Sequence, residues 1–143
     1  MTRTLRFLFA VFASATVASV CAQAPSDARP AGPIELFRSA LPDMPGKQLV
    51  VVALTIPPRR ADQPPSMGHR HPGSVYVYVT EGTARFGIEG QPVKEIKAGE
   101  SFFEPPGSTH LVSENASTTE PASLLAVIVA PPDETLTTMG QRK

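Results

Sequence analysis

The chain has 143 residues, which allows one domain and leaves little room for a second. Its 13 basic and 13 acidic residues balance, so the composition has no excess of positive charge that would indicate binding to nucleic acid or to an anionic membrane surface. The 16 Pro residues are too many for an all-helical domain, because Pro removes a backbone donor and clashes inside helices. The composition therefore predicts an all-β protein of short strands and many turns.

The first 22 residues have the pattern of a secretory signal peptide. Arg3 and Arg6 precede an uncharged apolar stretch over residues 7–20, which is too short for a comfortable membrane span. Small residues then predict cleavage after Ala22; the alternative, a lipid anchor on Cys21, is disfavoured by the bulky residue before it. Cleavage also removes the only Cys, which excludes a disulfide and a cysteine nucleophile. We therefore expect an exported protein, periplasmic or secreted, with no membrane attachment after cleavage.

The mature chain begins with a polar, Pro-rich segment over residues 23–33, which predicts a flexible leader. A single domain is expected over residues 34–131, opening with strands at 34–41 and 48–56. The second of these strands is apolar and β-branched, so we expect it to be buried on both faces. Residues 57–68 contain four Pro residues and predict an extended loop.

Six further short strands follow, with Gly or Pro at the turns. Their predicted ranges are 75–80, 83–89, 93–97, 101–104, 110–113 and 123–129. In the first of them Val alternates with Tyr76 and Tyr78, which predicts an inward Val face and an outward Tyr face. Residues 132–143 predict a polar C-terminal tail. Short strands at this regular spacing are typical of a sandwich or a barrel.

The chain contains only three His residues, and their spacing predicts one metal site. His69 and His71 stand at i and i+2, and on a strand such residues share a face, about 6.5 Å apart along the chain. Two imidazoles at that spacing can converge on an ion about 2.1 Å from each nitrogen, while Arg70 points the other way. A third ligand must come from another strand, and His110 lies on one that begins after the tight turn at residues 105–109.

The residues around these His resemble the two sequence motifs of the cupin superfamily. The first motif, H-x-H followed by a Glu and later a Gly, is matched by His69, His71 and Gly82. The second, G-x5-P-x-G-x2-H-x3-N, is matched by Gly99, Pro105, Gly107 and His110. Asn115 falls one place late for the second motif. The resemblance covers about residues 68–115 and implies a double-stranded β-helix (jelly-roll) barrel, a single cupin domain with a metal inside its mouth.

Val75 stands where the first motif usually has its ligand Glu. A valine cannot neutralise a cation, so the resemblance implies a three-His site whose charge is completed by water, a substrate or another carboxylate. Glu104, directly before the turn at residues 105–107, is the candidate for a fourth ligand or a catalytic proton-transfer group. The alternative is a surface carboxylate, because the turn breaks the register before His110 and leaves the direction of Glu104 open.

The resemblance implies an exported metal-dependent enzyme that acts on a small organic molecule by oxygenation, similar to the three-His dioxygenases of the superfamily. Its cofactor would be one divalent transition metal ion, and imidazole ligands are compatible with iron, manganese, nickel, copper and zinc. One alternative is a non-catalytic cupin that binds a small ligand or a metal. Another is a metal-free cupin similar to sugar-modifying isomerases. A small molecule is the expected partner, nucleic acid is not, and the family makes a homodimer a further expectation.

Two features near these motifs have more than one reading. Arg59 and Arg60 precede the His pair in the Pro-rich loop, where they would either meet an anionic substrate or form solvated charge pairs. Asn115 begins the pattern Asn-Ala-Ser, which matches a glycosylation acceptor. That pattern has meaning only in a eukaryotic host.

Overall fold

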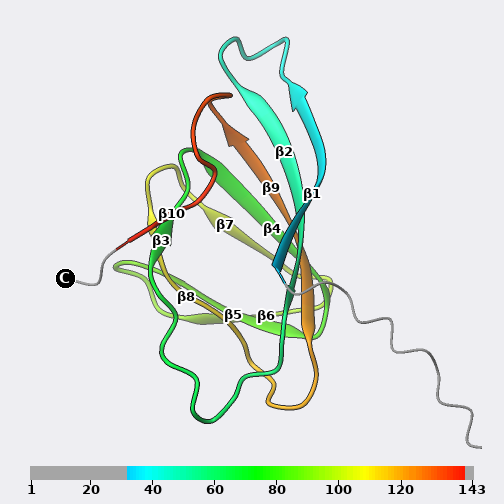
Figure 1. The fold of residues 1–143 in the computed structure, drawn as a ribbon, viewed down its shortest axis with the longest axis vertical. Coiled ribbons are helices and arrows are strands. Elements are labelled where there is room, and N and C mark those ends of the chain that lie inside the picture. The colour runs from blue at the N-terminus through cyan, green and yellow to red at the C-terminus, as the bar shows by residue number, and fades with distance from the viewer. Residues whose placement is uncertain (1–31, 141–143) are drawn as a thin grey trace, which may run out of the picture.

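The computed structural model describes residues 32–140, which form two antiparallel sheets of five strands each that face one another (Figure 1). The first sheet has the order β1 (Gly32–Ala40), β2 (Gln48–Ile56), β9 (Ala122–Ala130), β4 (Ser74–Glu81) and β7 (Ser101–Glu104). The second has the order β10 (Thr138–Met139), β3 (His69–Arg70), β8 (Thr109–Asn115), β5 (Thr83–Ile88) and β6 (Lys94–Lys97). The predicted all-β jelly-roll barrel is confirmed. The described residues contain no helix, and therefore none able to cross a membrane.

The N-terminal strand reaches further back than the sequence indicates. Gly32 and Pro33, expected at the end of the leader, already belong to β1 and pair with Thr55 and Leu54 of β2. The strand extends because β2 is long enough to offer partners for these backbone groups. The predicted signal peptide, residues 1–22, and the rest of the leader lie outside the described residues.

The C-terminal segment (residues 131–140) is part of the barrel and not only a polar tail. Its strand β10 pairs with β3, where Thr138 lies opposite Arg70 and Met139 opposite His69. The pairing continues in a hydrogen bond of 2.7 Å from the Gly140 N–H to the Gly68 carbonyl. The free edge of β3 would otherwise leave backbone groups without partners, and the C-terminal segment satisfies them.

Strand β2 is less buried than its apolar sequence predicts. Only Gln48 and Val50 are fully buried, and the remaining residues of the strand are half-buried. The inward side chains of Val52 and Leu54 border an open cavity instead of a filled core. The expectation of burial on both faces is therefore wrong, because one face of β2 looks into that cavity.

One face of strand β4 contributes three side chains to the hydrophobic core. Val75, Val77 and Val79 are buried with at most 3% of each residue exposed, whereas Tyr76 and Tyr78 are 47% and 39% exposed. Successive strand residues point to opposite faces, which produces this alternation. The prediction of inward Val and outward Tyr is confirmed.

Asn115 joins the two sheets at the end of β8. Its side chain is fully buried, and Nδ2 donates to the carbonyls of Ile56 at 3.1 Å and Glu120 at 2.7 Å. Its Oδ1 accepts from the backbone N–H of Ser117 at 2.8 Å. Because the amide is buried and its hydrogen bonds are satisfied, Asn115 is inaccessible to glycosylation in the folded protein.

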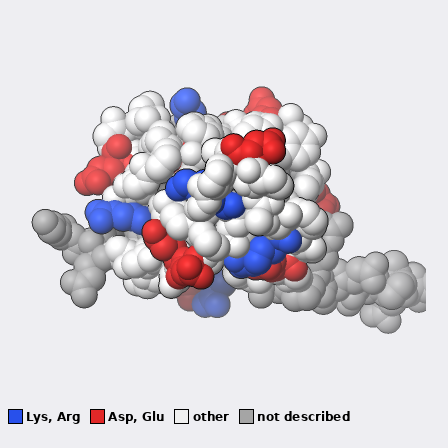
Figure 2. Space-filling model, turned by 90° about the horizontal axis from the view of Figure 1, so that it is seen from above, with Lys and Arg blue, Asp and Glu red and all other residues white. Residues whose placement is uncertain are grey.

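Charges of both signs are interspersed on the face that Figure 2 shows. Arg60 pairs locally with Asp62 at 2.6 Å, and Arg59 lies 3.8 Å from Glu114 of β8. The exposed Arg60–Asp62 pair contributes little to stability. Neither arginine lines the large cavity between the sheets, so the reading of solvated charge pairs agrees with the structure.

Candidate metal centre

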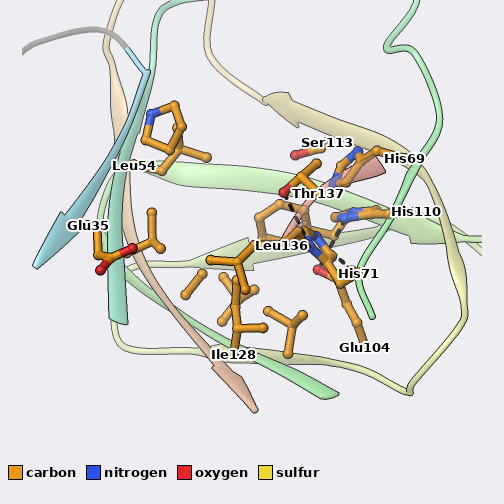
Figure 3. A pocket seen from close by; sticks show the side chains of 16 residues that line it. Glu35, Leu54, His69, His71, Glu104, His110, Ser113, Ile128, Leu136 and Thr137 are labelled. Carbon is orange, nitrogen blue, oxygen red and sulfur yellow. Dashed lines mark hydrogen bonds and ion pairs between the residues drawn. The ribbon is translucent and has the colours of Figure 1, made fainter. Parts of the chain in front are cut away.

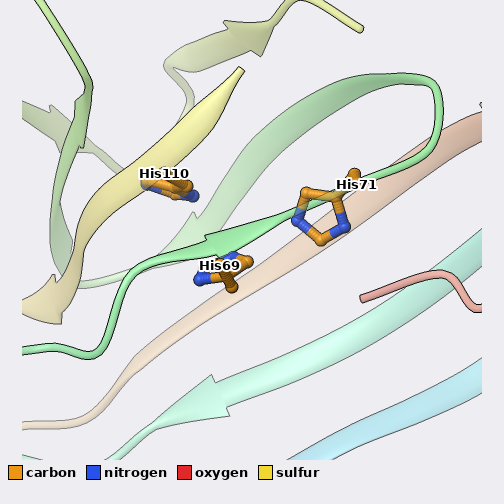
Figure 4. A group of neighbouring side chains, drawn as sticks. All are labelled: His69, His71 and His110. Atoms are coloured by element: carbon orange, nitrogen blue, oxygen red, sulfur yellow. The ribbon is translucent and has the colours of Figure 1, made fainter. Parts of the chain in front are cut away.

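The three His side chains come together from two neighbouring strands and from the residue that follows the first of them, His71 (Figure 4). His69 of β3 lies directly opposite His110 of β8 in the antiparallel register, and His71 follows two residues after His69. One ring nitrogen of each lies within 4.8 Å of the others. Three ligands about 2.1 Å from one ion lie roughly 3–4 Å apart, so small side-chain rotations close the set. The predicted convergence of His69, His71 and His110 is present.

His110 is buried between aromatic rings and has no hydrogen-bond partner in the described chain. Only 2% of the residue is exposed, and its ring lies 5.3 Å from the Phe86 ring and 6.0 Å from the Phe102 ring. Its Nδ1 is 3.1 Å from Glu104 Oε1, but the contact lacks hydrogen-bond geometry, and both ring nitrogens remain unpartnered. Buried polar atoms are nearly always satisfied, so these nitrogens indicate a missing partner such as a metal ion.

The C-terminal segment sets the orientation of His71. Its Nδ1 lies 2.6 Å from the carbonyl oxygen of Leu136, and a carbonyl only accepts hydrogen bonds. Nδ1 is therefore the N–H donor, and the lone pair of the neutral ring is on Nε2. That nitrogen points to the side of Glu104, whose Oε2 is 3.8 Å away. A backbone carbonyl that holds the non-ligating nitrogen of a His is a common support of metal ligands.

His69 is held in its neutral, ligand-competent form. Burial, and after it the nearby His110 and His71, lower its pKa from 6.5 to about 4, against a smaller opposite effect of Glu104. The ring meets His71 edge-on at 5.0 Å between centroids and His110 at 4.9 Å. At neutral pH His69 therefore has a free nitrogen lone pair, as a metal ligand requires.

Glu104 faces the His cluster, which resolves the direction that the sequence leaves open. Only 3% of the residue is exposed, and its Oε2 has no hydrogen-bond partner in the described chain. In the β4–β7 ladder Glu104 lies directly opposite Val75. Cross-strand partners share a face, with Cβ atoms about 5 Å apart. A carboxylate therefore faces the His cluster from the strand beside Val75.

A cavity of about 380 Å³ opens in front of these residues (Figure 3). His69, His71, His110 and Glu104 line one end of it, and Glu35 lies at the opposite end. Between them the walls are mainly apolar and come from both sheets and from the C-terminal segment. A concave, mostly apolar pocket with a few convergent polar groups is the usual form of a small-molecule site.

Some contributors to the site lie outside the sequence motifs. Phe86 and Phe102 flank His110, and Leu136 and Thr137 line the cavity from a segment expected to be a tail. The alternation of Phe102 with Glu104 in β7 was a signal that both point inward. Nothing in the local pattern of the C-terminal segment marks its approach to His71, apart from Leu136 and Met139 among mostly polar residues.

The chemistry of the donor set fits one divalent transition metal ion. Three neutral imidazoles and one carboxylate are ligands that such ions accept, and all three His side chains of the chain are used. A bound ion would satisfy Oε2 of Glu104 and one of the two unpartnered ring nitrogens of His110. The residues present therefore fit the metal that the motifs imply.

Two facing sheets around a His-lined cavity define a double-stranded β-helix protein with a candidate mononuclear metal centre. A family model described as the cupin domain matches residues 53–128, more than half of the chain. The chain belongs to the cupin family, as the two motifs predicted. No curated protein matches it.

Solved structures share this fold at low identity. A DMSP lyase from Ruegeria pomeroyi has a TM-score of 0.52 and 22% identity, over 63% of this chain and 42% of that chain. An oxalate decarboxylase has a TM-score of 0.51 and 20% identity, over 64% of this chain and 23% of that chain. A conserved protein with a double-stranded β-helix domain from Klebsiella pneumoniae has a TM-score of 0.49 and 21% identity, over 83% of this chain and 90% of that chain. The chain spans less than half of the lyase and decarboxylase chains, and these likenesses show the fold alone.

Proposed function

We propose that this protein is an exported, metal-binding cupin that works as a mononuclear-metal enzyme of the dioxygenase type on a small organic molecule. The observation that carries the proposal is the buried cluster of three His and Glu104 at the inner end of an apolar cavity. Some polar atoms of this cluster are buried without hydrogen-bond partners, which a purely structural role would not explain.

Each residue of the cluster has a distinct part in this proposal. His69, His71 and His110 hold the ion, and Glu104 is a fourth ligand or holds a proton at Oε2. A bound redox-active ion of this kind supplies open coordination positions for an organic oxygen ligand and for dioxygen. Imidazole and carboxylate are compatible with iron, manganese, nickel, copper and zinc, so the donor set leaves the identity of the ion open.

The chain's other groups prepare the site for a ligand. Phe86 and Phe102 restrict the ring of His110, and the Leu136 carbonyl fixes the proton of His71 on Nδ1. The apolar walls exclude water, which strengthens the electrostatic interactions at the His end. The DMSP lyase and the oxalate decarboxylase are named for other reactions, so the proposed oxygenation rests on the three-His site and not on these neighbours.

The direct test is elemental analysis of the mature protein, purified without a His tag and without added metal. We expect close to one transition metal ion per chain in the wild type and in the control Glu89→Gln, whose side chain is exposed. His69→Ala and His110→Ala should lose it, and Glu104→Gln should bind it at least about tenfold more weakly. A wild type that holds no metal and takes none up on reconstitution would refute the proposal.

The reaction class is tested by oxygen uptake with diketones and phenolics. Consumption of oxygen that depends on the metal and on His110 supports a dioxygenase, in which both oxygen atoms enter the organic product. Tight binding without oxygen uptake favours the non-catalytic binding protein. Turnover that survives thorough chelation but is lost in His→Ala variants favours the isomerase-like cupin.

Export is part of the proposal and rests on the N-terminal pattern of Arg3, Arg6 and the apolar stretch at residues 7–20. Expression of the full chain, followed by fractionation and N-terminal sequencing, should yield a periplasmic or secreted protein that begins at Gln23. An uncleaved cytoplasmic chain would contradict it. The homodimer stays a prediction, to be checked by light scattering.

A further inference from the structure

The buried polar groups of the cavity lie at its His end, whereas the charged side chain at the opposite end, Glu35, is exposed. Beyond the His cluster, its walls are formed chiefly by apolar side chains, among them Val52, Leu54, Val75, Val77, Ala126 and Ile128. Figure 3 shows several of these side chains between Glu35 and the His cluster. Of the described residues, no Lys or Arg lines the cavity. The walls can therefore bury an apolar body, but they offer no cation to an anionic group away from the His end.

The charges at the His end define what a head group must carry. Three neutral imidazoles and the Glu104 carboxylate leave a divalent ion with one net positive charge, a step that rests on the proposed function. One anionic oxygen of a ligand would neutralise that charge. A second anionic group would lie unpaired among apolar walls, where desolvation is costly.

The far end of the cavity offers an anion no free cation either. Glu35 lines it, and the hydrogen bond from Arg38 keeps the pKa of this carboxyl below its usual value, so it is ionised at neutral pH. Arg38 is already engaged, with Glu35 at 2.6 Å and with Gln48 Oε1 at 2.9 Å. A carboxylate that extended from the ligand toward this end would therefore find no free cation, because Arg38 is already paired with Glu35.

The size of the cavity limits the body of the ligand. A dry apolar cavity of about 150 Å³ holds one benzene ring. The volume here is about 380 Å³, which accommodates a substituted ring or a branched chain of similar bulk together with its head group. Leu136 of the C-terminal segment closes part of the wall beside it.

We propose that the cavity takes a one-ended amphipathic ligand: an apolar body about the size of one substituted ring, with a single anionic oxygen head group at the His end. Phenolates and enolates have this form. Small dicarboxylates, sugar acids and ligands with a second anionic group do not.

The test measures binding to the zinc-loaded mature protein by calorimetry. Four probes distinguish the contributions of the head group, of the apolar body and of a second negative charge. Benzohydroxamate presents a head group that becomes monoanionic on a metal, with an apolar ring. Acetohydroxamate has the same head without the ring, 4-carboxybenzohydroxamate adds a distal carboxylate, and oxalate is a small dianion. We expect benzohydroxamate to bind at least about tenfold more tightly than each of the other three.

The zinc content of the same sample separates the possible failures. Protein that takes up no zinc refutes the proposed function, and this inference with it. Zinc-loaded protein that binds the carboxylated probe or oxalate as tightly as benzohydroxamate overturns this inference alone. Equal binding of acetohydroxamate would likewise overturn it, because the apolar walls would then have no part in recognition.

A charge-rescue variant adds a second measurement. Leu54→Lys places an ammonium on the cavity wall, and we expect it to tighten binding of 4-carboxybenzohydroxamate at least about tenfold. The control Leu36→Lys changes a Leu that is 58% exposed on β1 outside the cavity, and should leave all four affinities unchanged. Thermal unfolding checks that both variants fold. If Leu54→Lys fails to fold, the wild-type ratios alone decide.

Discussion

At the scale of single residues, the site is defined by buried polar atoms that the chain leaves unsatisfied. Both ring nitrogens of His110 and Oε2 of Glu104 lack hydrogen-bond partners among the described residues. A buried polar group without a partner destabilises the fold by about 1–3 kcal/mol. Residues that serve folding alone would not be expected to combine a carboxylate and three imidazoles in this way. A bound cation would satisfy Oε2 of Glu104 and one of the two ring nitrogens of His110.

His69 gives the metal-free protein a defined pH dependence. Its pKa falls from 6.5 to about 4 on folding, mainly through burial. Between these two values the unfolded chain binds a proton that the folded chain does not, so acid favours the unfolded state in that range. We expect the melting temperature of the metal-free protein to fall as the pH drops from 6.5 toward 4, as circular dichroism can measure.

The control for this pH effect is His69→Gln, which removes the titrating group and keeps a polar side chain of similar size. Its melting temperature should fall less over the same range. Groups far from the cluster are the same in both proteins, so the difference between the two curves reports His69 and its coupling to the neighbouring His110, His71 and Glu104. Curves that run parallel between pH 7 and pH 4 would contradict the lowered pKa.

At the scale of elements, two antiparallel ladders assemble the donor set. The β3–β8 ladder sets His69 opposite His110, and the β4–β7 ladder sets Glu104 opposite Val75. The two ladders belong to different sheets, so the metal centre lies between them. A carboxylate on either strand of the β4–β7 pair would reach the same space, because cross-strand partners share a face.

This equivalence predicts that the carboxylate can be moved across the ladder. Glu104→Val alone should weaken metal binding at least about tenfold, and adding Val75→Glu should restore most of the loss. A chromophoric chelator in competition with the protein measures both affinities. The matched control adds Tyr76→Glu instead, at the adjacent outward-facing position, and should restore nothing. Rescue by Tyr76→Glu, or no rescue by Val75→Glu, would count against the ladder argument.

The C-terminal segment is the element that supports His71. Removing residues 133–143 takes away the Leu136 carbonyl that binds Nδ1, and we expect metal affinity to drop about 10–100-fold. The barrel should keep its circular dichroism spectrum, because β10 contributes only two residues to the second sheet. Removal of residues 141–143 alone is the control and should leave affinity unchanged. Equal affinities of the two truncated proteins would show that the carbonyl has no influence on His71.

At the scale of the whole molecule, the two sheets are tied together by buried contacts as well as by the shared core. Asn115 on the second sheet bonds to Ile56 at the end of β2 and to Glu120 before β9. Replacing it by Ala would leave two carbonyls and the Ser117 N–H without this partner. We expect Asn115→Ala to lower the free energy of unfolding by about 2–4 kcal/mol.

Urea unfolding followed by circular dichroism measures this loss, with Gln91→Ala as a control at an exposed amide. The control should change the free energy of unfolding by less than about 0.5 kcal/mol. A similar small change in Asn115→Ala would mean that water replaces the lost hydrogen bonds, and that Asn115 does not join the sheets.

Much of the fold could be predicted from local pattern. Eight strands were expected, and their observed bounds differ by at most two residues from the predicted ranges. The strand bounds could be predicted because the alternation of apolar and polar residues and the Gly or Pro turns are properties of neighbouring residues. The burial of β2 and the pairing of the C-terminal segment could not be predicted in this way, since both depend on what lies across the barrel.

The three candidate His ligands could be identified from the sequence itself. Their spacing within two motifs places them on neighbouring strands, and strand alternation points His69 and His71 to one side. The tertiary structure decided the rest of the site. It turned Glu104 inward opposite Val75, brought the Leu136 carbonyl to His71 and enclosed an apolar cavity without a cation. These features join segments far apart in the chain, and only the register and packing of the two sheets determine which of them meet.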